Sequence, residues 1–398
     1  MFFKHYAQSI IKALPANRLL ALDVFRGLTI AAMVLVNNPG SWSYVYAPMN
    51  HAKWHGWTPT DLIFPFFVFI VGVSIAIVMT RELRKGTHKL TLLKTALTRA
   101  VKLFGLGLFL ALFYFNVFDP NYSWLQQQLY GIRVMGVLQR LALVFFLTVF
   151  IVLYFKNAGR MLWMIGLLLG YWLALLFIPY VTSDGQVYIG VLEHGNSLTA
   201  WLDDYVIGAN HLYYGAALPF AFDPEGLLST LPAVSGCLIG VFTGQLLISR
   251  KKQLVTKAKI LCFTGVGFII LGELWGNYFP INKALWTSSF VIMSSGWALF
   301  LLGFLTWLLD IKGQKLWSAP FVVFGANAIF FYMFSSVLAR LLIMIPVAEN
   351  SLHHWLFTEI YQAMFGNYIG SLAFAMMFLL ISYIVTHWLF KKQIFFKV

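Results

Sequence analysis

The sequence has few charged residues, and this scarcity excludes a broad class of proteins. Asp, Glu, Lys and Arg together make up 11% of the 398 residues, whereas soluble domains carry about 25%. Hydrophobic residues reach 60%, and the mean hydropathy is +0.78. A soluble globular protein is therefore excluded, and the composition indicates a polytopic membrane protein.

Cysteine is also scarce, and the familiar short catalytic motifs are missing. The two cysteines, Cys237 and Cys262, lie inside apolar runs, so we interpret them as packing residues and expect no disulfide framework. No GxSxG, Walker or CxxC motif occurs. Serine hydrolases, ATP-driven pumps and thiol redox enzymes therefore have no motif support.

Long apolar runs are abundant, and each is long enough to cross a bilayer as a helix. The sequence predicts an all-α membrane bundle that forms one domain over residues 1–398, with no soluble catalytic domain. We expect the first run to be a retained helix rather than a cleaved signal, because it contains Asp23 and Arg26. The ten predicted spans are 19–38, 61–79, 100–118, 134–154, 161–181, 226–248, 260–277, 286–309, 318–345 and 369–389.

Basic residues outnumber acidic ones by 28 to 14, and they are sorted along the chain. If the N-terminus is inside, 22 of the 28 fall in cytoplasmic segments, among them Arg18 and Lys397, and only Lys53, Arg133 and Lys283 fall outside. This asymmetry follows the positive-inside rule, so it predicts cytoplasmic termini and requires no nucleic-acid partner. The predicted external segments are 39–60, 119–133, 182–225, 278–285 and 346–368.

A few polar residues lie at or near the expected membrane depth, where charge is costly and often functional. Asp23 and Arg26, three residues apart, can pair with each other, or Arg26 can face a phosphate. A second cluster contains residues of the first external loop and of the start of the fourth span: Asn37, His51, His55, Asp61, Arg133, Gln139 and Arg140. In the longest external segment, Asp223 or Glu225 can cap the sixth span.

Histidine is the natural candidate for a base in this external cluster, since its ordinary pKa is close to physiological pH. The alternative interpretation of His51 is a solvated loop residue. The local spacing contains no HExxH motif, and we expect no metal.

Several sequence blocks resemble one membrane acyltransferase family. They are `LDVFRGLTIAAMVLVNN`, `NHAKWHGWTPTDLIFPFFVFIVGVSI`, `IRVMGVLQRLALVFF`, `LDDYVIGANHLYYG`, `AFDPEGLLSTLPA`, `FPINKALWTSSFV` and `KKQIFFKV`. In this order they are similar to the family of heparan-alpha-glucosaminide N-acetyltransferase and its bacterial inner-membrane relatives. The resemblance implies transfer of an acetyl group from cytoplasmic acetyl-CoA, a co-substrate, to an amino sugar on the external side.

The resemblance also implies roles for individual residues. His51, in `NHAKW`, matches the proposed active-site histidine, and Asn37 matches the asparagine beside it. We expect His51 to act as general base and Asn37 to donate to the oxyanion. Asp61 either orients His51 or caps the second span. A covalent acetyl-histidine intermediate is the alternative to direct transfer.

Binding residues are expected at both faces. CoA phosphates favour basic side chains, and the candidates are Arg26, Arg99, Lys102 and Arg140. The candidates for acceptor binding are His55, His211, Asn282 and Lys283. His55 stands where the animal enzyme has asparagine, which leaves the acceptor sugar open.

Two other classes of function remain compatible with the sequence. A sugar or solute transporter would use the same intramembrane polar groups as a path, and an assembly protein would need none of them for chemistry. We expect the bacterial inner membrane as the location, with membrane lipids, acetyl-CoA and an amino sugar as partners. A homodimer is allowed but not required by anything in the sequence.

Overall fold

The computed structural model describes residues 2–12 and 19–396 of the chain. Met1, residues 13–18 and residues 397–398 lie outside the described residues, and with them Arg18 and Lys397 of the basic set.

The described part of the chain is mostly helical, and its strands form three two-stranded antiparallel hairpins. The hairpins pair β1 (Tyr180–Val181) with β2 (Val187–Tyr188), β3 (Leu192–Glu193) with β4 (Asn196–Ser197), and β5 (Pro346–Val347) with β6 (Asn350–Ser351). The long helices are α2 (Leu20–Asn37), α3 (Ile63–Arg84), α4 (Lys89–Leu112), α5 (Val137–Tyr154), α6 (Asn157–Phe177), α8 (Thr230–Ile248), α9 (Leu254–Gly276), α10 (Ser288–Leu305), α12 (Ala328–Met344) and α15 (Asn367–Lys391).

Shorter helices lie between and beyond the long ones. The α-helical ones are α1 (Phe2–Lys12), α7 (Leu198–Ile207), α11 (Ala319–Ala326), α13 (Leu352–Trp355) and α14 (Ala363–Phe365). The 3₁₀ turns are η1 (Ala47–Met49), η2 (Pro59–Leu62), η4 (Ala209–His211) and η6 (Leu316–Ser318), and the π-helical turns are η3 (Trp124–Leu129), η5 (Thr306–Ile311) and η7 (Leu356–Gln362).

The prediction of a polytopic helical membrane protein is confirmed. Among the described residues, nine helical segments are long and apolar enough to cross a membrane, and a bent pair brings the number to ten. The third span begins at Lys89 rather than near residue 100, because the helix continues through the basic turns that precede its apolar run. The same helix ends at Leu112, so residues 113–118 of the predicted span lie outside the helix although most of them are apolar.

The ninth predicted span, 318–345, is not one straight helix. The segment Leu316–Ala326 and α12 meet at an angle of 76°. The break lies at Asn327, whose amide donates to the carbonyl of Ile394 (2.8 Å) and accepts from the N–H of Phe396 (3.0 Å). The chain after α15 therefore satisfies the side-chain amide of Asn327 at the break.

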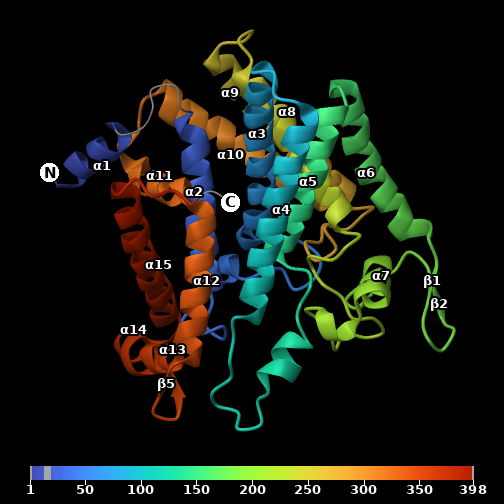
Figure 1. Cartoon of the computed structure of the whole chain (residues 1–398), viewed down its shortest axis with the longest axis vertical. Coiled ribbons are helices and arrows are strands. Elements are labelled where there is room, and N and C mark those ends of the chain that lie inside the picture. Colours follow the sequence, from blue (N-terminus) through green and yellow to red (C-terminus); the bar gives the residue numbers. More distant parts are fainter. Residues whose placement is uncertain (1, 13–18, 397–398) are drawn as a thin grey trace.

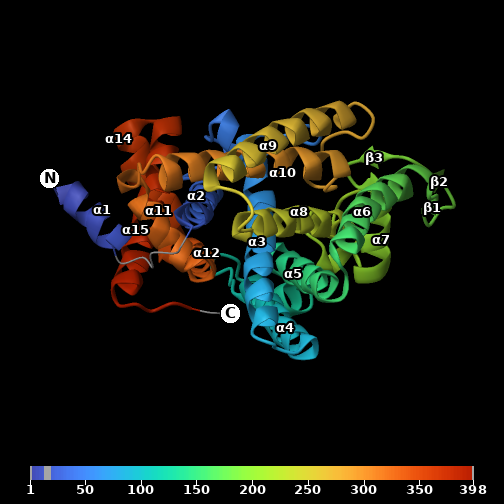
Figure 2. The same ribbon diagram turned by 90° about the horizontal axis from the view of Figure 1, so that it is seen from above.

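Helices α3, α8 and α10 form the centre of the larger group of helices. A side chain at Gly72 would collide with the carbonyl of Cys237, and one at Gly240 with that of Phe69, so glycine permits the close approach of α3 and α8. About 67% of the span is buried for α8 and α10 but only 22–28% for α4, α6 and α9, which lie at the outside. Figure 2 shows this arrangement from above, with α2, α11, α12 and α15 as a second group.

The segments predicted to be external gather at one end of the bundle. Figure 1 shows α7, the β1–β2 hairpin, α13 and α14 at the lower end and the turns that join α3 to α4, α5 to α6 and α8 to α9 at the upper end. Hydrogen bonds join the lower segments to one another, as between the N–H of Gly56 and the carbonyl of Ile281 (2.7 Å). The alternation of loops agrees with the predicted topology; that the lower end faces outward stays a prediction.

Candidate active site

A cavity of about 380 Å³ opens among the loops at the lower end of the bundle. Its wall includes four of the predicted catalytic and acceptor-binding residues, namely Asn37, His51, Asp61 and Lys283. They come from the end of α2, the following loop, η2, and the loop before α10. We name this space the loop cavity. Its volume lies in the range of small-molecule sites, about 300–1,000 Å³.

His51 and Asp61 are in direct contact in this wall. Nδ1 of His51 lies 2.6 Å from Oδ1 of Asp61. The Asp61 side chain is 1% exposed, whereas the His51 side chain is 49% exposed to the cavity and solvent. Because an ionised carboxylate only accepts hydrogen bonds, this contact places the proton on Nδ1 and leaves Nε2 with the lone pair.

The other oxygen of Asp61 holds the loop that carries His51. Oδ2 accepts from the N–H of Ala52 (3.0 Å), the N–H of Thr58 (3.0 Å) and the hydroxyl of Thr58 (3.1 Å). Thr58 and Asp61 form a capping box at the start of η2. The same carboxylate therefore contacts the imidazole and caps the helix turn, the two roles that the sequence left as alternatives.

Lys283 brings a cation to the pair from a distant part of the chain. Its Nζ lies 3.1 Å from Nδ1 and 3.3 Å from Nε2 of His51, and 3.6 Å from Oδ1 of Asp61. Burial lowers the pKa of the Lys283 ammonium, and the attraction of Asp61 opposes this shift. The wall thus combines an imidazole, a carboxylate and a desolvated ammonium.

The loop that carries Lys283 is rigidly held. The side-chain oxygen of Asn282 accepts from the N–H of Leu285 (2.9 Å), and Thr287 donates its N–H to the carbonyl of Asn282 (3.1 Å). Trp286 has a positive φ of 52°, an uncommon conformation for a bulky residue that the surroundings must stabilise. The guanidinium of Arg140 lies 4.8 Å from its ring centroid.

His55 and Asn282 support the site rather than line it. Nδ2 of Asn282 lies 3.4 Å from Nδ1 of His55, and neither residue belongs to the wall of the loop cavity. Burial lowers the pKa of His55 and favours its neutral form. Asn37 does line the cavity, and its amide has no hydrogen-bond partner among the described residues. That amide is available to a ligand.

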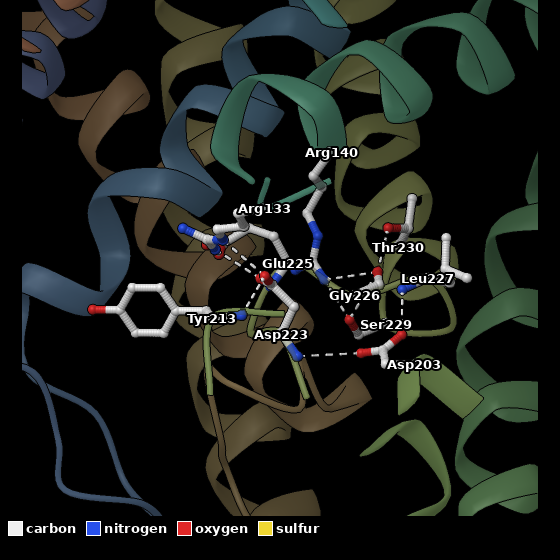
Figure 3. Close-up of polar contacts among 10 residues, drawn as sticks. All are labelled: Arg133, Arg140, Asp203, Tyr213, Asp223, Glu225, Gly226, Leu227, Ser229 and Thr230. Atoms are coloured by element: carbon white, nitrogen blue, oxygen red, sulfur yellow. Dashed lines mark hydrogen bonds and ion pairs between the residues drawn. The ribbon is translucent and has the colours of Figure 1, made fainter. Parts of the chain in front are cut away.

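A buried charge network closes one side of the loop cavity (Figure 3). Arg133 donates to both oxygens of Asp223 (2.7 Å each) and to Glu225 (2.6 Å). Burial opposes the charge of Arg133, but the two carboxylates outweigh it and raise its pKa. Asp203 accepts from the N–H groups of Leu227 (2.9 Å) and Asp223 (3.4 Å), and burial raises its pKa to about 7.

Arg140, which the sequence predicts to contact CoA, lies in this network. It is fully buried, donates to the carbonyl of Gly226 (3.2 Å) and to the hydroxyl of Ser229, and does not line the loop cavity. Figure 3 shows it reaching the turn before α8. The carboxylates of the network and the ring of Trp286 surround Arg140. Arg140 therefore links the network to the loop that carries Lys283.

His211, expected to bind the acceptor, also lies outside the loop cavity. Its Nδ1 is 2.8 Å from the carbonyl of Ile132, and its own carbonyl accepts from the N–H of Val134 (3.2 Å). The residue therefore ties the 182–225 segment to the segment before α5.

A second cavity of about 400 Å³ extends from the loop cavity toward the opposite end of the bundle. Arg26 and Arg99 line it, whereas Lys102 is exposed and does not. Arg26 pairs with Asp23 (2.7 Å), and the guanidinium of Arg99 lies 5.2 Å from the ring centroid of Phe145. We name this space the bundle cavity.

Five residues line both the loop cavity and the bundle cavity, which are therefore adjacent. We name them the collar: Met33, Phe64, Phe67, Val137 and Tyr332. The two spaces together connect basic residues at one end of the bundle with the His51–Asp61 pair at the other.

Sequence reasoning missed the aromatic part of the loop cavity. Trp54 donates its indole N–H to the carbonyl of Leu192 (2.8 Å) and packs edge-on against His194 (5.3 Å between ring centroids). His194 packs in turn against Tyr214 (4.9 Å). The sequence does contain a signal for it, because `NHAKW` and `ANHLYYG` hold more aromatic residues and histidines than a loop that only contacts water requires.

In residues 2–12 and 19–396, no group of three His, Cys, Asp or Glu side chains is arranged to hold a metal ion. The two cysteines are free, and Cys237 is buried.

Comparison with known proteins identifies similar sequences. Residues 18–273 match the family model described as "Heparan-alpha-glucosaminide N-acetyltransferase, catalytic". The chain is 31% identical to the Mus musculus protein named heparan-alpha-glucosaminide N-acetyltransferase, over 96% of this chain and 61% of the mouse protein. It is also 31% identical to the Homo sapiens protein of that name, over 81% of this chain and 53% of the human protein. The chain thus spans little more than half the length of these relatives.

Proposed function

The chain belongs to the heparan-alpha-glucosaminide N-acetyltransferase family, and from this premise we propose that it is a membrane enzyme that transfers an acetyl group from acetyl-CoA to the amine of an amino sugar. The donor enters from the cytoplasmic side through the bundle cavity, and the acceptor enters the loop cavity from the outside. Both termini are cytoplasmic, and the membrane is the bacterial inner membrane. The observation that carries the proposal is the adjacency of the two cavities, with His51 in the one and basic residues at the other.

Arg26 and Arg99 bind the phosphates of acetyl-CoA at the mouth of the bundle cavity. Guanidinium groups suit this task because they donate several hydrogen bonds in a fixed geometry. The pantetheine arm then follows the apolar wall of the bundle cavity and brings the thioester past the collar. Exclusion of water along this path protects the thioester from hydrolysis.

His51 acts as the general base in the transfer. Nε2 takes a proton from the acceptor amine as the nitrogen attacks the thioester carbonyl, a C–N bond forms, and the C–S bond breaks. The His51 imidazolium gives this proton to the departing thiolate, so CoA leaves as the thiol and the neutral base is restored. Asp61 keeps the imidazole in the required tautomer and stabilises the imidazolium that forms.

Asn37 and Lys283 assist the same step from the cavity wall. The free amide of Asn37 donates to the oxygen of the thioester as negative charge develops there. Lys283 disfavours the protonated form of a neighbouring amine, since like charges repel, and so it increases the fraction of acceptor able to attack. Trp54, His194 and Tyr214 offer apolar ring faces to the sugar.

Direct transfer requires no acetyl-enzyme intermediate, because donor and acceptor occupy adjacent spaces at the same time. The test uses purified protein in nanodiscs with [¹⁴C]acetyl-CoA and glucosamine. N-acetylglucosamine should form, and protein rapidly denatured in detergent at neutral pH, where an acetyl-imidazole survives longer than in acid, should carry no label when acceptor is omitted. Failure to acetylate any amino sugar would refute the proposed activity, and stable label on His51 would replace direct transfer by the covalent route.

A further inference from the structure

A third cavity of about 340 Å³ lies beside the loop cavity, between α4, the start of α5 and α12. It shares Arg133, Val137, Tyr213 and Tyr332 with the loop cavity. It also shares Val137, Leu138 and Tyr332 with the bundle cavity, but its polar residues Gln139 and Arg340 have no role in the proposed donor path or in the His51 chemistry. We name it the lateral cavity.

The helices on two sides of the lateral cavity lie at the outside of the bundle. Only 28% of the α4 span is buried, and α12 buries only Phe331 and Ser335. Figures 1 and 2 show both helices on the same side of the molecule. At the lower end a contact closes the seam between them, because the N–H of Phe115 lies 3.1 Å from Sδ of Met344. Above that contact both helices expose apolar residues, such as Val101 and Leu341, so we expect the seam to border the bilayer.

Arg340 places a positive charge in the wall of this cavity. It lies one turn before the end of α12, donates to the carbonyl of Ser336 (3.1 Å), and has no ion-pair partner within residues 2–12 and 19–396. A basic residue that only marked the membrane surface would extend toward water. Arg340 is half-buried and lines the lateral cavity, so its charge can attract an anion there.

Gln139 adds an unsatisfied polar group to the same wall. The residue is 3% exposed and lines the lateral cavity, and its amide makes no hydrogen bond within the described part of the chain. Because the amide is not among the fully buried atoms without a partner, it is accessible from the cavity and can hydrogen-bond a ligand there. The Gln139 amide packs directly against Gly107 of α4, so any side chain at position 107 would collide with it.

The rest of the wall is apolar. Leu110, Ala111 and Leu138 face the same space as Arg340 and Gln139. A site that combines a cation, a free amide and an apolar wall, and that borders the bilayer, fits the phosphate of an amphiphile. Its overlap with the loop cavity at Arg133 and Tyr213 would let a group attached to that phosphate reach His51.

We propose that the lateral cavity binds the phosphate of an acceptor in which the amino sugar is linked through that phosphate to a membrane lipid. The inference rests on the proposed acetyl transfer and names the acceptor class. The lipid chains remain in the bilayer beside α4 and α12, Arg340 and Gln139 bind the phosphate, and the sugar extends into the loop cavity. The chemistry at the amine is unchanged.

The test compares three acceptors with the protein in nanodiscs. They are a synthetic lipid in which glucosamine is joined through a phosphodiester to diacylglycerol, the same lipid without the phosphate, and free glucosamine. The wild type should use the phospholipid with a kcat/KM about tenfold above that of the neutral lipid, as expected for one charge-assisted contact. Arg340→Gln should bring this ratio close to one.

A matched pair of glycines on α4 tests the role of Gln139. Gly107→Ala displaces the Gln139 amide and should lower the ratio severalfold, whereas Gly105→Ala, which meets no other atom within 4 Å, should leave it unchanged. Thermal unfolding shows whether each variant is folded. A ratio that is one in the wild type, or that Arg340→Gln leaves unaltered, overturns the proposal.

Failure of the acetyl transfer itself would be seen separately. Native mass spectrometry counts the phospholipid molecules bound to wild type and to Arg340→Gln without any turnover. If no acceptor is acetylated but the wild type alone retains the phospholipid, the acetyl transfer is refuted while the lipid site stands. If both proteins bind the lipid equally, the lateral cavity is not the site.

Discussion

Oδ1 of Asp61 lies 2.6 Å from Nδ1 of His51, so the carboxylate determines which ring nitrogen faces the chemistry. The acid is almost fully buried and its second oxygen accepts three more hydrogen bonds. The position of the Asp61 carboxylate is therefore fixed before any substrate binds, and the carboxylate in turn fixes the orientation of the His51 imidazole.

Replacement of His51 by alanine should lower kcat by about 10²- to 10⁴-fold, the usual contribution of a general base. Affinity for acetyl-CoA should be nearly unchanged, because the donor head binds in the other cavity. Single-turnover kinetics and calorimetric titration with acetyl-CoA measure the two quantities. His55→Asn is the matched control and should cost much less, since His55 does not line the loop cavity. A loss within tenfold for His51→Ala would reject it as the base.

Asp61→Asn should lower kcat by about 10- to 100-fold, because an amide cannot stabilise the imidazolium as a carboxylate does. The same change should also lower the melting temperature, since one amide oxygen cannot replace all the hydrogen bonds that the two carboxylate oxygens accept. Activity assays and thermal unfolding of the same preparation check both effects. Full activity would show that Asp61 only caps η2.

Arg26→Gln and Arg99→Gln should each raise the KM for acetyl-CoA about three- to tenfold with little change in kcat, as expected when a uniform binding contact is lost. Lys102→Gln, on the same helix as Arg99 but outside the bundle cavity, should have no effect. The wild-type KM should also rise with salt, because the contacts involve charge. Equal effects at Arg99 and Lys102 would contradict the placement of the CoA head.

The network around Asp203 should make stability depend on pH. Burial raises the pKa of Asp203 from its ordinary value of 3.8 to about 7, so between these values the folded protein keeps a proton that the unfolded chain releases. Stability therefore falls as pH rises from 4 to 7, by about 1.4 kcal/mol per pH unit at the steepest. Asp203→Asn should remove this contribution. Melting temperatures of both proteins at pH 5, 6 and 7 should diverge if the inference is right.

Cysteine labelling tests the orientation of the bundle. Ala200 in the long loop segment is buried and would report poorly, whereas Tyr205 on α7 is 78% exposed. In intact cells, a membrane-impermeant maleimide should label Tyr205→Cys and should miss Lys252→Cys in the turn between α8 and α9. The opposite pattern would reverse the direction of acetyl transfer.

The spans were predictable because each requires only an uninterrupted apolar run, which is local information. The break at Asn327 was not, since a single asparagine in such a run is common and its partners, Ile394 and Phe396, lie about 70 positions away. The beginning of α4 was missed for a related reason. Hydropathy detects only the apolar part of a helix, so it did not detect the basic turns through which α4 extends beyond its apolar run.

The site could be predicted in part. His51 and Asp61 belong to one short loop, so their proximity was within reach of the sequence. Lys283 lies 232 positions from His51, and only the packed bundle brings its ammonium to the imidazole. Arg140 was a candidate for CoA binding because CoA phosphates favour basic side chains, but the fold turns this side chain toward Gly226 and Trp286.

The collar has a consequence for the membrane as a whole. If the water-accessible spaces at the two ends of a membrane protein were continuous, protons would leak across the bilayer and dissipate the proton gradient. Met33, Phe64, Phe67 and Val137 present hydrocarbon where the two spaces meet, and an ion without its hydration shell faces a barrier on the order of tens of kcal/mol in such surroundings. The same few side chains that would admit a thin, uncharged thioester arm in the proposed transfer therefore oppose the passage of ions between the two cavities.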